Sequence, residues 1–191
     1  MTDPGRDDGL TETDPTEFDL VEADPVLAEP VPARSVGSSL RLSIIIAGVV
    51  VAIDQVTKHW ALNALADGNP IHVIWTLQWN LSFNSGMAFS RGQGIGPIIG
   101  ALALVVVVVM LISLRKSGSR TAAVAVGLVV GGALGNIADR LFRERGWLHG
   151  RVIDFIDFQW FPIFNVADMA INIGGALLVL TAILDSKAMA K

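Results

Sequence analysis

Cysteine is absent from the 191-residue chain, which excludes disulfide bonds, thiol nucleophiles and thiolate metal sites. Histidine is scarce, and the three histidines (His59, His72 and His149) do not have the HExxH spacing of a zinc protease. No stripe of basic residues suggests a nucleic-acid partner. Neither Ser85 nor Ser90 lies in a motif that supplies a serine nucleophile with a base. We therefore expect carboxylate chemistry, with no metal and no cofactor.

Apolar residues, by contrast, are abundant: the chain is 52% hydrophobic and its mean hydropathy is +0.55, which is too apolar for an ordinary soluble domain. Long apolar runs of membrane-spanning length cover residues 42–66, 97–114, 121–140 and 165–184. Between them, residues 73–84 alternate with period two and predict one amphipathic strand. VIDFIDFQWFPIF predicts another strand-like piece, although Pro162 limits how much regular structure it can hold. The sequence thus predicts a membrane α-helical fold, with four transmembrane helices and a small extracytoplasmic β platform.

Charge is concentrated at the start of the chain. Residues 1–40 hold ten of the eighteen acidic residues, five of the eight prolines and only two basic residues. Such a segment cannot bury enough apolar surface to offset the entropy of ordering it. We predict a disordered acidic cytoplasmic tail over 1–40 and a four-helix membrane domain over 41–186. Because a signal peptide would start basic and then turn apolar, the first apolar run is expected to be an uncleaved span.

Two signals orient the predicted helices. Most basic residues flank one side, which the positive-inside rule identifies as cytoplasmic: Arg34, Arg41, Arg115, Lys116, Arg120, Lys187 and Lys191. All five tryptophans fall on the other side, as an aromatic belt along one interface: Trp60, Trp75, Trp79, Trp147 and Trp160. That other side also carries Arg91, Arg143, Arg145 and Arg151. We predict that both termini are cytoplasmic.

Polar residues gather at the outer ends of these apolar runs. Each ionisable group at membrane depth costs roughly 2.5–3.5 kcal/mol on insertion scales, which makes such groups functional candidates. Two aspartates that share one proton can hydrolyse an amide without a metal. The candidates come from four separate stretches and are Asp54, Lys58, Asn84, Asn136, Asp139, Arg140, Asp154, Asn165 and Asp168.

Some of these residues have a structural alternative. Asp54 and Lys58 lie four apart on one helical face, which suits either an ion pair inside the bundle or a substrate-facing role. Gly127, Gly131 and Gly135 form a stripe that favours close helix packing over ligand binding.

The motifs DQVTK, NSGMAF, GGALGNIADR, VIDF and FNVAD, in this order, resemble those of lipoprotein signal peptidase (signal peptidase II) over about residues 42–184. The resemblance implies an aspartyl endopeptidase that removes the signal peptide from diacylglyceryl-modified prolipoproteins, cutting just before the lipidated cysteine. It also implies that Asp154 and Asp168 form the catalytic dyad. The polar support it implies is Asp54, Lys58, Asn84, Asn136, Arg140 and Asn165.

The resemblance further implies a bacterial inner (cytoplasmic) membrane protein, with its active site at the outer face. Its partners would be prolipoprotein substrates, membrane lipids and globomycin-type inhibitors, and no nucleic acid. Asp157 rivals Asp154 for the dyad, but its odd spacing on an alternating segment predicts the opposite face. We also expect Arg140 to pair with Asp139 or another carboxylate. A small transporter or proton relay, and a purely structural scaffold, are the alternative functions.

Overall fold

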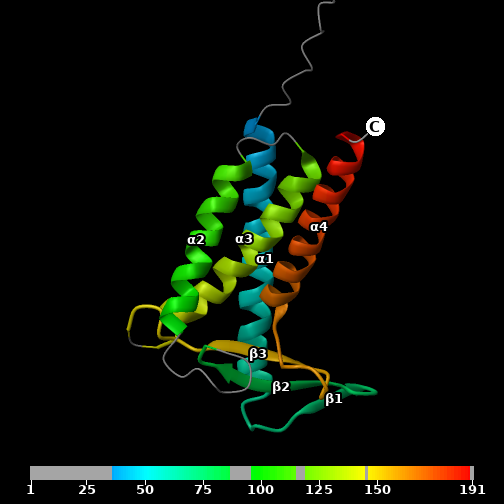
Figure 1. Cartoon of the computed structure of the whole chain (residues 1–191). Helices are drawn as coiled ribbons and strands as arrows, with labels where there is room; N and C mark the ends of the chain where they lie inside the picture. Colours follow the sequence, from blue (N-terminus) through cyan, green and yellow to red (C-terminus); the bar gives the residue numbers. More distant parts are fainter. Residues whose placement is uncertain (1–35, 87–95, 115–118, 145, 190–191) are drawn as a thin grey trace, which may run out of the picture. The chain divides into compact units, whose positions relative to one another are not determined.

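A computed structural model of the chain describes residues 36–86, 96–114, 119–144 and 146–189. Within these residues the elements are α1 (Val36–Ala64), β1 (Ile71–Ile74), β2 (Leu77–Asn84), α2 (Gly96–Leu114), α3 (Arg120–Phe142), β3 (Val152–Asp157) and α4 (Val166–Met189). The helices form a bundle and the strands lie across one end of it (Figure 1). In the part of the chain described, four helices are long and apolar enough to cross a membrane. The predicted fold class is confirmed.

Helix α3 is the central helix of the bundle. About 61% of its apolar span is buried, against 17–22% for the other three. Its glycines allow this burial, because a Cβ added to Gly131 would come 2.7 Å from the Cβ of Val50 on α1. On another face of α3, a Cβ on Gly132 would collide with Ala167 and Ile171 of α4. The predicted packing role of the glycine stripe is confirmed.

Helix α1 begins at Val36, six residues before the predicted start of the first span. Residues 36–40, which the sequence assigned to the tail, therefore form its first turns. The apolar run marks only the part of the helix that suits the hydrocarbon core of a membrane, whereas the helical hydrogen bonds of the backbone continue beyond it. Residues 1–35, the remainder of the predicted tail, lie outside the described residues, as do Arg34, Arg91, Arg115, Lys116, Arg145 and Lys191.

The sheet is antiparallel, in the order β1-β2-β3. The prediction of one strand over 73–84 is wrong, because the chain reverses at Trp75 and Thr76 to form a hairpin. Trp75 has a φ of 51°, a left-handed conformation unusual for a bulky residue. The turn leaves the period-two pattern uninterrupted, so alternation alone could not reveal it.

Strand β3 is buried along its whole length and joins the sheet to the end of α1. Ile153 and Phe155 pack in one apolar cluster with Ala61 and Leu65 of the first helix and its following turn. The rings of Trp60, Trp79 and Phe155 are within about 6 Å of one another. This packing fixes the position of β3, and hence of Asp154, relative to the ends of the helices.

Candidate active site

Asn165 and Asp168 define the first turn of α4 by capping each other. The backbone N–H of Asp168 donates to Asn165 Oδ1 at 3.0 Å, and the backbone N–H of Asn165 donates to Asp168 Oδ2 at 3.2 Å. This reciprocal arrangement is a capping box built with Asn and Asp. It fixes the Asp168 carboxylate at the N-terminus of the helix, where the helix dipole stabilises negative charge.

Asp154 approaches the same asparagine from the sheet. Asn165 Nδ2 donates to Asp154 Oδ1 at 2.6 Å, and Asn84 Nδ2, from the last residue of β2, donates to Asp154 Oδ2 at 3.2 Å. Asn165 is fully buried. One buried amide therefore bridges the two carboxylates, holding Asp154 through its side chain and Asp168 through its backbone.

Asn136 of α3 connects this pair to α1. Its Nδ2 donates to Asp168 Oδ1 at 2.9 Å, while its Oδ1 accepts from Lys58 Nζ at 2.9 Å and from Asn165 Nδ2 at 3.2 Å. Asn136 can therefore offer Asp168 only its N–H side, because its oxygen is already occupied. The orientation of the amide that faces Asp168 is set by Lys58.

Lys58 is fully buried and its three ammonium donors have three acceptors. It lies 2.8 Å from Asp54 Oδ2 and 2.7 Å from Asp139 Oδ2, in addition to its bond to Asn136. Arg143 Nε binds Asp139 Oδ1 at 2.5 Å. Two acids and two bases thus form a neutral cluster, as a buried ionic network requires.

The ion pair between Asp54 and Lys58 that the sequence allowed is confirmed, in its structural form. Both side chains are fully buried. Asp54 also accepts the backbone N–H of Ala167 at 3.0 Å, which ties α1 to the first turn of α4. Gly135 makes room for this contact, because a Cβ there would lie 2.6 Å from Asp54 Oδ2.

The environment of Asp154 favours its protonated form. Burial, and then the negative charge of Asp168, raise the pKa of Asp154 from its ordinary 3.8 to about 7, although bonds from Asn84 and Asn165 and the charge of Lys58 oppose the shift. At neutral pH, a proton is therefore readily held on this carboxyl.

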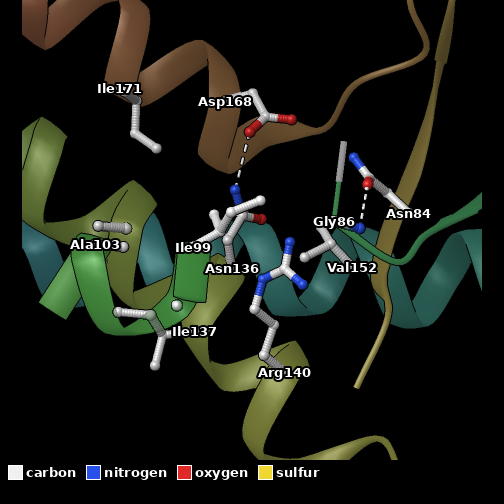
Figure 2. Close-up of a pocket in the computed structure, with 12 residues that line it drawn as sticks. Asn84, Gly86, Ile99, Ala103, Asn136, Ile137, Arg140, Val152, Asp168 and Ile171 are labelled. Carbon is white, nitrogen blue, oxygen red and sulfur yellow. Dashed lines mark hydrogen bonds between the residues drawn. The ribbon is translucent and has the colours of Figure 1, made fainter. Parts of the chain in front are cut away.

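A cavity of about 300 Å³ opens beside the pair, between α2, α3 and α4 (Figure 2). Its polar wall includes Asn84, Asn136, Arg140 and Asp168. The rest is largely apolar, formed by Ile99, Gly100, Ala103, Ala133, Ile137, Val152 and Ile171. Asp154 is 3% exposed and does not itself line the cavity; its carboxylate reaches the wall through Asn84. Residues 87–95, which include the rest of the NSGMAF motif, lie outside the described residues.

Arg140 does not behave as the sequence predicted. Asp139 pairs with Lys58 and Arg143 instead, and the structure gives Arg140 no ion pair with a carboxylate of the described residues. Its Nη1 is buried without a hydrogen-bond partner, and only 5% of the residue is exposed. Figure 2 shows the guanidinium extending from α3 among the residues that line the cavity. Successive residues on a helix point about 100° apart, so Arg140 faces the cavity while Asp139 faces α1.

Asp157 belongs to a different set of contacts. Its Oδ2 accepts from Gln78 at 2.8 Å and Asn80 at 2.9 Å, and its Oδ1 accepts the backbone N–H of Gln159 at 2.6 Å. Burial opposes ionisation, but these three hydrogen bonds together lower the pKa of Asp157. It is a stably ionised carboxylate that anchors the hairpin to β3.

Eight of the nine residues singled out from the sequence form one connected network, and Arg140 is the exception. Two further members of the network were not predicted from the sequence. Gln55 donates to Asp54 and Asp139, and Arg143 pairs with Asp139. The i,i+4 spacing of Asp139 and Arg143 was a signal that could have found the second.

The arrangement suits acid–base chemistry on a bond held in the cavity. It offers a carboxylate that accepts hydrogen bonds at a helix N-terminus and a neighbouring carboxyl that holds a proton near neutrality. Within the described residues, no group of three or more His, Cys, Asp or Glu side chains is placed to hold a metal ion.

Comparison with known proteins gives a consistent result. Residues 46–184 match the family model described as signal peptidase (SPase) II. A lipoprotein signal peptidase from Mycobacterium avium (strain 104) is 43% identical over 141 residues, which cover 73% of this chain and 77% of the relative. One from Mycobacterium tuberculosis (strain ATCC 25618 / H37Rv) is 41% identical over 145 residues, covering 75% and 72%.

The fold also resembles a solved structure described as a bacterial membrane enzyme, determined by the in meso method at 2.3 Å resolution. The TM-score is 0.65 and the sequence identity 31%. The match covers 75% of this chain and 88% of that one.

Proposed function

Because the chain belongs to the signal peptidase II family, we propose that Asp154 and Asp168 are the two carboxylates with which it hydrolyses its substrate. The chain is a multi-pass bacterial membrane protein, and it is an aspartic peptidase that removes the signal peptide from prolipoproteins. Family membership identifies an enzyme, so the transporter and scaffold alternatives are set aside.

One observation carries the proposal: the side-chain amide and backbone N–H of buried Asn165 bind Asp154 and Asp168 respectively. The two carboxyl groups belong to different elements, β3 and α4, and would not otherwise be held close to each other. A dyad needs such fixed proximity, since two like charges close together favour sharing one proton.

We assign the shared proton to Asp154 and the negative charge to Asp168. Asp168 lies at the N-terminus of α4 and accepts from Asn136 and from its capping partner, which stabilises an anion. Asp154 is more deeply buried, and its pKa is raised to about 7. With one proton on the pair, its single negative charge balances the charge of Arg140, which interacts electrostatically with both.

In the first step, Asp168 takes a proton from a water molecule as the water oxygen attacks the scissile carbonyl carbon. The proton of Asp154 passes to the carbonyl oxygen, giving a neutral tetrahedral diol. In the second step, the C–N bond breaks, the proton on Asp168 moves to the leaving nitrogen, and a diol hydroxyl returns its proton to Asp154. The dyad ends as it began.

Arg140 would bind the substrate rather than a protein carboxylate. A buried guanidinium nitrogen without a partner is costly, and a substrate backbone carbonyl in the cavity would provide the missing acceptor. The apolar wall of the same cavity suits the lipid-bearing part of a diacylglyceryl precursor, cut just before its lipidated cysteine. We place globomycin-type inhibitors in this cavity for the same reason.

We propose that the sheet end of the bundle lies at the outer face of the bacterial cytoplasmic membrane, with both termini in the cytoplasm. Arg41 and Arg120 support this orientation, because they lie near the N-terminal ends of α1 and α3. Those helix ends lie opposite the sheet (Figure 1). The natural absence of cysteine allows a direct test. In intact cells, a membrane-impermeant maleimide should label Asn69→Cys but not Ser186→Cys, and the reverse pattern would invert the orientation.

The choice of Asp154 is tested by two matched substitutions on the same strand. Asp154→Asn should slow cleavage of a diacylglyceryl prolipoprotein by at least about a thousandfold. Asp157→Asn, three residues away but hydrogen-bonded to the hairpin, should retain substantial activity. Cleavage is followed by gel shift in detergent, with thermal unfolding as a check on folding. An inactive Asp157→Asn beside an active Asp154→Asn would show that the wrong strand carboxylate was assigned.

A further inference from the structure

A second polar cavity, of about 370 Å³, lies at the sheet end of the bundle and shares no residue with the active-site cavity. We name it the arginine pocket; its lining includes Leu62, Phe83, Phe142, Arg143, Glu144 and Arg151. Phe83 pairs with Ile153 in the sheet, one position from the pair of Asn84 and Val152 that lines the active site. Since successive strand residues face opposite sides, the arginine pocket lies on the other face of this strand pair.

The ion pairs of the two arginines in this pocket do not involve their terminal guanidinium nitrogens. Arg151 binds Glu144 at 2.6 Å and Arg143 binds Asp139 at 2.5 Å, and each of these contacts uses only Nε. The guanidinium of Arg151 lies 4.9 Å from the centre of the Phe83 ring, which is a cation–π contact. The terminal nitrogens of a guanidinium form the fork that matches a phosphate group.

The chemistry around these arginines is that of a membrane surface. Phe142 is the last residue of the α3 span and is 83% exposed, and Phe83 is 45% exposed. Residues 142–151 carry three arginines and one glutamate, on the side where the positive-inside rule disfavours them. The ion pair with Asp139 accounts for Arg143, but neither the hydrolysis of a peptide bond nor the packing of the bundle accounts for Arg151 beside exposed aromatic rings.

We propose that the arginine pocket binds the phosphate of an anionic phospholipid in the leaflet on the sheet side of the membrane. Arg143 and Arg151 hold the phosphate oxygens, while Phe142 and Leu62 lie against the glycerol and upper acyl chain. Glu144 competes with the phosphate for Arg151. The bound lipid would fix the depth of the sheet relative to the membrane surface.

The experiment is native mass spectrometry of the full chain in detergent, titrated with phosphatidylglycerol or with phosphatidylcholine of the same acyl chains. Wild-type protein should bind one phosphatidylglycerol several-fold more tightly than phosphatidylcholine. Arg151→Gln should weaken phosphatidylglycerol binding about fivefold, the effect typical of one arginine at an anionic surface. Glu144→Gln should strengthen it, because the internal competitor is removed. Arg120→Gln, an exposed arginine at the opposite end of α3, is the matched control and should change nothing.

Equal affinity for the two lipids, or an Arg151→Gln variant that binds as wild type does, would overturn the proposal. Millimolar inorganic phosphate that displaces all phosphatidylglycerol from the protein would also contradict it, by indicating a site for a soluble anion. Phe142→Ala is a second variant that tests the pocket in case Arg151→Gln fails to fold. It alters only the exposed apolar wall and should also weaken the binding of phosphatidylglycerol. Retained cleavage activity in each variant shows that the bundle is intact, because none of the four substituted residues belongs to the dyad or its support.

Discussion

Lys58 is the residue whose replacement should damage the fold most, although no part of it lines the active-site cavity. Its ammonium bonds Asp54, Asp139 and Asn136 at 2.7–2.9 Å, all inside the bundle. Lys58→Met keeps the volume and removes the charge. The cluster then has two buried carboxylates and only the guanidinium of Arg143 to balance them.

The size of the effect follows from that imbalance. Removing one partner of a buried ion pair typically costs about 3–5 kcal/mol, because the remaining charge is left uncompensated. Adding Asp54→Asn to Lys58→Met restores neutrality, since Asp139 still pairs with Arg143. The double variant should therefore recover at least about 1.5 kcal/mol of the loss, as a coupling energy between contacting residues.

The assay is reversible unfolding in mixed micelles of increasing SDS fraction, with Arg41→Met, an exposed basic residue on the same helix, as the matched control. The control should unfold like the wild type. A Lys58→Met variant within about 1 kcal/mol of the wild type would refute the view that the cluster needs its positive charge. A double variant less stable than the single would refute the neutrality argument.

Three further predictions concern pH, packing and substrate binding. The proposed mechanism requires a protonated Asp154, whose pKa is about 7, so kcat/KM should fall about tenfold per pH unit as pH rises well above 7. Rates that stay flat to pH 9 would contradict the assignment. Gly135→Ala, whose Cβ would lie 2.6 Å from Asp54 Oδ2, should lower the unfolding free energy by about 1–3 kcal/mol, whereas Gly48→Ala, with open space around it, should not. Arg140→Lys keeps the charge but loses the planar fork, so cleavage should slow at least about tenfold at an unchanged unfolding midpoint; wild-type turnover would make the arginine a mere interface anchor.

The helices and most of the polar network could be predicted from the sequence because both follow from the free-energy cost of placing unpaired polar groups in a membrane. Long apolar runs have few alternatives to a spanning helix, and polar groups such as Asp54 and Lys58 at membrane depth need partners. Four stretches that each carry such groups at the same end of a span must bring them together. The sequence therefore indicated which residues meet, although it did not indicate which atoms bond.

The features that could not be predicted from the sequence depend on local geometry. The hairpin was missed because alternation continues through the turn at Trp75, and no Gly, Asn or Pro marks the reversal. The expected pairing of Arg140 with Asp139 or another carboxylate was wrong: Asp139 turns toward Lys58 and Arg143 on a different face of α3, and Arg140 forms no ion pair with another carboxylate of the described residues. Gln55 was missed because nothing in the sequence indicates that its side chain reaches Asp139 of α3.

The central claim is that Asp154 and Asp168 act as one unit, and single-turnover cleavage of a diacylglyceryl prolipoprotein by Asp168→Asn tests it most directly. Asp168→Asn should cost at least about a thousandfold, roughly 4 kcal/mol of barrier, and combining it with Asp154→Asn should add little, since either loss disables the pair. Binding of globomycin to each variant checks that the cavity is still formed. A fully active Asp168→Asn, or a double variant whose loss is the product of two independent losses, would contradict the aspartyl dyad.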